Sequence, residues 1–441
     1  MLPPSPTRSR SLLGGALVLA LAATLAPAAL SSASAEELVP ALAAPTCPQA
    51  SAVVGFPLYL DQLVPRVDIE AGVTVSLSGT EPVGLVLSSE DRFKGRLVGK
   101  PAMVETKTFD VIATRAASGG GVEKKTTSCT MAIKAAPTFS RIAGTDRYDQ
   151  SVKVSKATFT TADVVYLTSG EKFADALGAS AVAVQHKAPL LLTQAGTITT
   201  GVIDEIKRLG AKDVVVVGGA LSVADSILAE VKTAIPSVTV TRVGGVDRYA
   251  VSRNLIAHPA FGATESETVF VATGATFPDA LSATPAAALV GAPVLLVNGA
   301  EAALTPDEKT TLAGVEAKKI TIVGGELSVS PALQADFAKT YTTSRIAGQN
   351  RYDVSLNINR MSFAKTDAVY IASGEVFPDA LTGGIAAAMA KAPLYINDSI
   401  CFGHQPAEEI GRMAPLKNIY LGGPNTLPDS YNGQLPFCKI D

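Results

Sequence analysis

The sequence contains no tryptophan, three histidines and four cysteines among 441 residues. Without tryptophan the chain lacks the broadest flat aromatic side chain, which disfavours sugar binding on aromatic platforms. Lysine and arginine number 37 against 40 acidic residues, giving a formal net charge of −3. Nucleic-acid binding needs clustered basic side chains, so no nucleic-acid partner is expected. An anionic ligand would have to be held by local groups.

The composition is that of a folded protein, with 47% hydrophobic and 17% charged residues, and the length suits several domains. Residues 1–35 have the pattern of a secretory signal peptide. Arg8 and Arg10 precede an apolar run at 12–26, and Ala33-Ser34-Ala35 matches a small-residue cleavage site. A membrane anchor is the alternative, but the run is shorter than the roughly 20 residues of a spanning helix. We expect a secreted protein that is not membrane-embedded after cleavage.

Secretion permits disulfide bonds. Four cysteines allow three pairings. Only Cys47–Cys129 with Cys401–Cys438 keeps each bridge inside one module, so we predict these two structural disulfides. The C-x-x-C spacing of many metal sites is absent, and no metal is expected.

One nonapeptide recurs three times, as RIAGTDRYD at 141–149, RVGGVDRYA at 242–250 and RIAGQNRYD at 345–353. Internal repeats of this kind decide the architecture. Four further blocks follow each copy at nearly constant spacing. They are an apolar run ending in glycine (164–170, 268–274, 368–374), an F-x-D-A-L block (172–180, 276–284, 376–384), an A-P run (188–193, 292–297, 392–397) and a Gly-Gly block (214–223, 321–329, 419–427).

The apolar runs lack polar alternation, as in parallel strands covered by helices on both faces. Helical stretches such as 200–209 separate them, which predicts βαβ units. Each repeat is therefore expected to be a Rossmann-like, doubly wound α/β domain, at 139–237, 238–339 and 342–441. The uncharged stretch 280–297 is interrupted by Pro285 and Pro293. It predicts a helix, a turn and a buried strand, not a membrane span.

Residues 46–136 differ, because Val73, Val75 and Leu77 alternate with polar residues and Gly- and Ser-rich turns separate short strands. This pattern predicts a small all-β sandwich. It resembles the immunoglobulin-like domains of bacterial surfaces.

The second arginine of each opening motif is the best candidate for ligand contact. It lies near the start of a helix, at the sheet edge where ligands of α/β proteins bind. A structural role is nevertheless the favoured interpretation, in which the motif Asp caps the helix and the Arg pairs with the Asp of the F-x-D-A-L block. The candidate ligand-binding residues are Arg147, Arg248, Arg351, Asp175, Asp279 and Asp379. The three Phe residues of the same block, Phe173, Phe277 and Phe377, are expected to be core anchors.

Catalysis has little support in the sequence. His186, His258 and His404 stand at non-equivalent positions of the three repeats, whereas a triad or zinc site built on the repeat would need an equivalent His each time. No G-x-S-x-G elbow or full G-x-G-x-x-G is present, and one Asp per repeat does not make a glycosidase pair. No catalytic residue and no cofactor is predicted.

Together the motifs R-[IV]-x-G-x-[DN]-R-Y, S/T-G-x-x-F-x-D-A-L, A-P-[LV]-L-L and V-G-G resemble the bacterial cell-wall-binding repeat, type two. The resemblance implies three Rossmann-like domains around a pseudo-threefold axis, attached non-covalently to an anionic wall polysaccharide or teichoic-type polymer. It places the three Arg and three Asp candidates in the motif's Arg and Asp positions. Asn350 departs from Asp146 and Asp247, and the third repeat is expected to be abbreviated at its end.

The favoured hypothesis is a secreted, non-enzymatic protein of the cell wall or cell surface. One alternative is a peptidoglycan hydrolase or a modifier of an autolysin. Another is a binding protein for a small anion or nucleotide.

Overall fold

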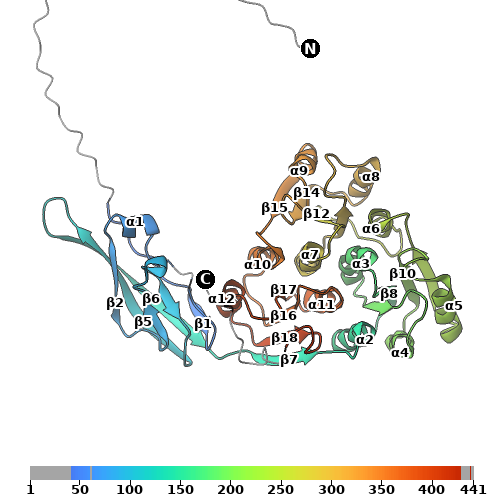
Figure 1. Ribbon diagram of the computed structural model, residues 1–441, viewed down its shortest axis with the longest axis horizontal. Helices are drawn as coiled ribbons and strands as arrows, with labels where there is room; N and C mark the ends of the chain where they lie inside the picture. The colour runs from blue at the N-terminus through green and yellow to red at the C-terminus, as the bar shows by residue number, and fades with distance from the viewer. Residues whose placement is uncertain (1–40, 60–61, 429–437, 439–441) are drawn as a thin grey trace, which may run out of the picture. The chain divides into compact units, whose positions relative to one another are not determined.

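Three parallel four-stranded sheets form the repeat region of the computed structural model, which describes residues 41–59, 62–428 and 438 (Figure 1). The predicted signal peptide lies outside the described residues. The first sheet has the order β11-β10-β8-β9, and the other two have the corresponding orders β15-β14-β12-β13 and β7-β18-β16-β17. The strands are β7 (Thr138–Ile142), β8 (Val164–Ser169), β9 (Leu190–Thr193), β10 (Asp213–Val217), β11 (Thr239–Val243), β12 (Thr268–Thr273), β13 (Val294–Val297), β14 (Lys319–Val323), β15 (Thr342–Ile346), β16 (Ala368–Ser373), β17 (Leu394–Asn397) and β18 (Lys417–Leu421).

The fourth strand of each sheet comes from a different repeat of the sequence. Strand β11, which opens the second repeat, pairs with β10 of the first, and β15 pairs with β14 in the same way. Strand β7, which opens the first repeat, pairs with β18 of the third. The three repeats thus close into a ring by strand exchange, so the sheets do not follow the sequence boundaries.

Helices cover both faces of these sheets. They are α2 (Arg147–Thr158), α3 (Phe173–Gln185), α4 (Thr200–Leu209), α5 (Asp225–Ala234), α6 (Arg248–Ile256), α7 (Pro278–Leu289), α8 (Pro306–Gly314), α9 (Pro331–Ala338), α10 (Arg351–Ser362), α11 (Pro378–Met389) and α12 (His404–Met413). The equivalent helices α3, α7 and α11 contact one another at the centre (Figure 1). Their buried faces are rich in Ala, Gly and Ser. Such small side chains let the helix axes approach one another closely. The predicted helix, turn and strand at 280–297 are confirmed by α7 and β13.

The N-terminal region is a mixed β structure. Its elements are β1 (Ser51–Val53), α1 (Arg66–Glu70), β2 (Thr74–Gly79), β3 (Leu85–Leu87), η1 (Asp91–Phe93), β4 (Leu97–Gly99), β5 (Glu105–Ala116) and β6 (Val122–Lys134). One sheet has the order β1-β6-β5-β2, with β1 parallel to β6, and β3 and β4 form a second sheet. Side chains from both sheets share a core that includes Leu85, Leu97, Phe109 and Met131. The predicted fold class is confirmed, while the immunoglobulin-like resemblance stays a prediction.

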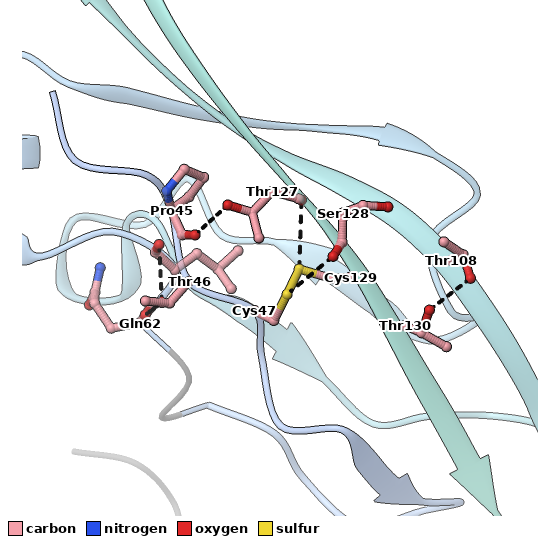
Figure 2. The surroundings of a disulfide bond; sticks show 10 residues. Pro45, Thr46, Cys47, Gln62, Thr108, Thr127, Ser128, Cys129 and Thr130 are labelled. Carbon is pink, nitrogen blue, oxygen red and sulfur yellow. Dashed lines mark hydrogen bonds between the residues drawn. A yellow bond between two sulfur atoms is a disulfide. The ribbon is translucent and has the colours of Figure 1, made fainter.

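Both predicted disulfides are formed, Cys47–Cys129 and Cys401–Cys438. The first ties the segment before β1 to β6, the last strand of the β region (Figure 2). Beside it the Thr127 hydroxyl donates to the Pro45 carbonyl at 2.7 Å, so the bridge and a hydrogen bond hold the same two segments together.

The β region packs against the third repeat. The Tyr59 amide donates to Glu408 Oε1 at 3.0 Å, and Gly411 of α12 faces Phe56 so closely that a Cβ there would lie 3.1 Å from it. Helix α12 also contacts β1. Within the described ranges, no helix has the length and apolar character needed to cross a bilayer.

Candidate functional site

The motif Asp or Asn is a helix cap in all three repeats. Asp146 accepts hydrogen bonds from the Tyr148 and Asp149 amides, and Asp247 accepts one from the Ala250 amide. Asn350 accepts the two equivalent bonds in the third repeat. Because Asn and Asp cap equally well, the departure at Asn350 leaves the local structure unchanged.

Each candidate arginine is the first residue of the capped helix and binds the strand-end glycine of its own repeat. The Nη1 atoms of Arg147, Arg248 and Arg351 donate at 2.6, 2.7 and 2.7 Å to the Gly170, Gly274 and Gly374 carbonyls, respectively. The following Tyr packs on the same glycine, where a Cβ at Gly170 would lie 2.9 Å from the Tyr148 ring. The Arg-Tyr pair therefore fastens the opening loop to the end of the neighbouring strand.

The three Phe residues meet one another as a cluster, with ring centroids 5.5, 6.0 and 6.1 Å apart. They are partly buried and pack against the core, as expected of anchors. Each guanidinium lies over the Phe ring of the preceding repeat. The pairs are Arg147 over Phe377 at 5.9 Å, Arg248 over Phe173 at 5.6 Å and Arg351 over Phe277 at 5.8 Å. The cation–π contacts thus link the repeats in the same cyclic order as the exchanged strands.

The three candidate Asp residues pack against the first glycine of each Gly-Gly pair. These glycines, Gly218, Gly324 and Gly422, have φ of +118°, +116° and +96°, and a Cβ at Gly218 would lie 2.6 Å from Asp175 Oδ2. Asp279 accepts a hydrogen bond from Ser328, and Asp379 accepts one from Thr426. In the part of the chain that the structure describes, no ion pair joins these Asp side chains to the three Arg residues. The expected Arg–Asp pairing is thus replaced by Arg–carbonyl and Asp–hydroxyl bonds.

Burial raises the pKa of Asp279 and Asp379, while the Ser328 or Thr426 hydrogen bond and the nearby Arg351 or Arg147 charge act in the opposite direction. The Arg charges therefore lower the pKa of these carboxyls without direct contact.

The opening arginine of each motif has a bracing role that sequence reasoning missed. Arg141, Arg242 and Arg345 lie on the exchanged strands and donate to the Gly422, Gly218 and Gly324 carbonyls at 2.7, 2.7 and 2.8 Å. Arg242 also donates to the Val223 carbonyl, and Arg345 to that of Val329. Its recurrence in all three copies was the signal that could have identified it.

Grooves lie where the opening loop of one repeat meets the preceding one. A cavity of about 600 Å³ between the first two repeats is lined by the start of α3, the Gly-Gly loop and the loop that carries Arg248. An equivalent cavity of about 210 Å³ lies between the third repeat and the first, and Arg147 and Asp379 line it. Among the described residues, α3, α7 and α11 begin without a side-chain cap. Each groove edge therefore combines one arginine with the N-terminus of an uncapped helix.

The grooves differ in their lining. The first has Lys172, whose Nζ donates to the Leu221 carbonyl at 2.9 Å, at a position occupied by Thr276 and Val376 in the other repeats. Its edge also carries Leu221 and Val246, which are 87% and 97% exposed. The first groove therefore has a second basic side chain, Lys172, and two highly exposed apolar side chains at its edge.

The histidines are not brought together. His186 contacts the Gly262 carbonyl, the ring of His258 accepts from the Phe261 amide, and His404 contacts the Cys438 carbonyl. Across residues 41–59, 62–428 and 438, no group of three or more His, Cys, Asp or Glu side chains could hold a metal ion.

Known proteins resemble this chain in sequence and in fold. It is 29% identical to N-acetylmuramoyl-L-alanine amidase LytC of Bacillus subtilis (strain 168) over 58% of this chain and 50% of LytC. It is 30% identical to the amidase enhancer of the same strain over 55% of this chain and 32% of the enhancer. The chain thus spans at most half the length of these relatives.

Two solved structures from Clostridium difficile share the fold. Cwp6 matches with a TM-score of 0.61 and 19% identity, over 85% of this chain and 65% of Cwp6. Cwp8 matches with a TM-score of 0.58 and 22% identity, over 81% of this chain and 62% of Cwp8.

The family model of cell wall binding domain 2 (CWB2) matches three times, at 141–228, 242–334 and 345–432. Together these matches cover more than half of the chain, and each begins at the opening arginine of a repeat. The chain therefore belongs to the CWB2 family and carries three cell-wall-binding repeats.

Proposed function

We propose that this chain is a secreted, non-catalytic protein of the cell surface that attaches non-covalently to the wall, and that its repeat grooves hold an anionic glycopolymer. The observation that carries the proposal is the recurring groove edge, where an arginine stands beside an uncapped helix N-terminus. Helix N-termini attract anions because their amide groups are unpaired and the helix dipole is positive there.

The charges at the groove suit an anion in spite of the nearby Asp. Arg147 uses Nη1 on the Gly170 carbonyl, and its side chain is exposed at the cavity it lines. Asp379 is buried, and its raised pKa and its bond from Thr426 reduce its repulsion of an anion. Arg147 is therefore more accessible than Asp379, and the exposed Asp146, which also lines this cavity, accepts the cap hydrogen bonds of α2.

Several grooves on one polymer give avidity. Once one groove is occupied, the next binding step is intramolecular, so weak sites combine into attachment stronger by about two to four orders of magnitude. The ring keeps the two grooves at a fixed separation, which suits a repeating polymer.

Co-sedimentation of the full chain with purified walls tests the proposal. Walls stripped of their anionic polymer should lose binding, and high salt should weaken it on intact walls. Lys172→Ala should weaken binding, whereas Thr276→Ala at the equivalent position of the second repeat serves as the matched control. Binding that survives both removal of the anionic polymer and high salt would contradict the proposal that the ligand is a polyanion.

A second candidate, action on peptidoglycan or on an autolysin, is favoured by the names of the two Bacillus relatives. Zymography on wall material separates it from attachment. A lysis band that a single substitution abolishes would require a catalytic residue and refute the non-catalytic proposal.

A further inference from the structure

A separate cavity of about 440 Å³ lies on the third repeat, between the opening loop, helix α10 and the start of α12. Its volume falls in the range of small-molecule sites. Four of its lining residues carry amide side chains, Gln349, Asn350, Asn357 and Gln405, and one, Asp353, carries a carboxylate. No Lys or Arg of the described residues lines it, and it shares no lining residue with the repeat grooves described above.

Hydrogen bonds to the backbone orient three of these side chains. Asn350 Oδ1 accepts from two amides of the first turn of α10, which leaves its Nδ2 group as a donor. Asn357 Nδ2 donates to the Ala347 carbonyl at 2.7 Å, which leaves its Oδ1 as an acceptor. Asp353 Oδ2 accepts from the Gln349 amide, and its Oδ1 remains as a second acceptor. The cavity therefore has oriented donors and oriented acceptors.

The two glutamines add groups that can adapt to a ligand. Both Gln349 and Gln405 are exposed, and among the residues that the structure describes neither side chain takes part in a hydrogen bond. Each has a carbonyl oxygen that accepts and an NH₂ group that donates. The buried Leu356 supplies an apolar surface to the same lining.

The first repeat has an ion pair at the equivalent place. Lys153 is the counterpart of Asn357, and its Nζ lies 3.3 Å from Oδ2 of Asp149, the counterpart of Asp353. Because asparagine replaces this lysine in the third repeat, Asp353 forms no ion pair within the described ranges. Its carboxylate therefore keeps its full capacity to accept from a hydroxyl group, in a charge-assisted hydrogen bond.

The second repeat also has an ion pair there. Arg253 Nη2 lies 3.4 Å from Asp307 Oδ2, at the positions that Leu356 and Gln405 occupy in the third repeat. In the first repeat the position of Gln405 is held by Gly201, which has no side chain. The complete set of amides is thus particular to the third repeat, where uncharged groups replace the ion pairs of the other two.

This set of groups fits an uncharged ligand with neighbouring hydroxyl groups. An anion would meet the Asp353 carboxylate without a basic side chain of the lining, and a cation gains little from one partly exposed carboxylate. A hydroxyl group both donates and accepts, so two adjacent hydroxyls can pair with a carboxylate or carbonyl oxygen and with an NH₂ group. Because the chain has no tryptophan, hydrogen bonds and not stacking on a broad ring would carry recognition.

We propose that this cavity binds an uncharged sugar or polyol through vicinal hydroxyl groups. The hydroxyls donate to Asp353 and to Asn357 Oδ1, and they accept from Asn350 Nδ2 and the two glutamines. The vicinal hydroxyls belong either to a sugar ring or to an open-chain polyol. The proposal is independent of the anionic polymer, because the cavity and the repeat grooves have no residue in common.

Ligand-observed NMR titrations of the full chain test this with the methyl glycosides of glucose, mannose and galactose and with D-sorbitol. At least one of these uncharged ligands should bind, and its Kd should change less than about twofold between low and high salt, since no ligand charge is screened. Tighter binding of a glycoside or of sorbitol assigns the hydroxyls to a ring or to an open chain. No saturable binding of any of the four ligands, or loss of binding at high salt, would overturn the proposal.

Asn357→Lys introduces the residue of the first repeat and localises the site. The new ammonium group can bond the Ala347 carbonyl, as Lys153 Nζ bonds that of Ala143, and it can pair with Asp353. The variant should therefore fold and should weaken ligand binding about threefold or more. Unchanged binding would contradict the site.

Asn254→Lys is the matched control, because Asn254 makes the equivalent bond to the Gly244 carbonyl in the second repeat, where Ala250 replaces the carboxylate. It should leave the Kd unchanged, and a loss equal to that of Asn357→Lys would overturn the site. Lys172→Ala should also leave it unchanged, whereas a loss there would place the ligand in the first groove. Gln405→Ala removes no hydrogen bond of the described chain and should weaken binding about threefold, so it decides even where Asn357→Lys fails to fold.

Discussion

Replacing Arg147 by alanine separates the two roles available to the repeated arginine. The change removes the 2.6 Å hydrogen bond from Nη1 to the Gly170 carbonyl and the cation–π contact with Phe377 of the third repeat. A hydrogen bond to a charged group contributes about 1.5–3 kcal/mol, and an exposed cation–π contact about 0.5–1 kcal/mol. Because Arg147 is exposed, the lower ends apply, and we expect the free energy of unfolding to fall by about 2 kcal/mol.

Urea denaturation followed by circular dichroism measures this change, and wall co-sedimentation at 25 °C measures binding while the variant is still folded. Lys153→Ala is the matched control, since Lys153 is a basic residue of the same helix and lines neither repeat groove. It should change stability by about 1 kcal/mol or less. If Arg147→Ala is no less stable than Lys153→Ala, the bracing inferred from the geometry is wrong. If binding is undiminished, Arg147 does not touch the polymer.

Two further predictions follow from the exchanged strands and the buried carboxyls. A fragment of residues 145–247 includes all four strands of the first sheet, β8, β9, β10 and β11, and should unfold cooperatively in urea. A fragment of residues 139–237 lacks β11 and should be less stable. Equal stability of the two fragments would contradict the strand exchange. The raised pKa of Asp379 means that the native state holds this proton to a higher pH than the unfolded chain, so its contribution to stability falls as pH rises from about 3.8 through the native pKa. Asp379→Asn keeps an acceptor for Thr426 and should therefore gain stability relative to the parent between pH 3 and pH 7, and a difference independent of pH would refute this.

Much of the fold could be predicted from the sequence because its strands are short, uniformly apolar runs. Residues 164–170 and 188–193 predict strands, and β8 and β9 occupy them. The two disulfides were also predictable, since only one pairing keeps each bridge inside a module. Buried strands and disulfides within one module can be predicted because the residues that define them lie in the same part of the sequence.

The strand exchange could not be predicted in the same way. The opening strands read TFSRI, TVTRV and TTSRI, and nothing in five residues specifies which sheet they join. Pairing of β7 with β18 depends on contacts between distant residues, such as the Arg141–Gly422 bond, which spans 281 residues. The contact of Arg147 could not be predicted either. One Arg and one Asp per repeat do not reveal that the guanidinium lies over the Phe of a different repeat.

Ring closure also gives a physical reason for the number three. Each sheet takes its fourth strand from the next repeat, and β7 fills the remaining place beside β18. The opening strand of a fourth repeat would compete with β7 for that edge, and it would need a fourth Phe in a cluster whose three rings already contact one another. The first and third repeats are therefore neighbours, and the groove between them depends on β7, which pairs with β18 at the other end of the repeat region. A substitution in β7 should accordingly perturb the groove that contains Asp379 before it perturbs the groove that contains Asp175.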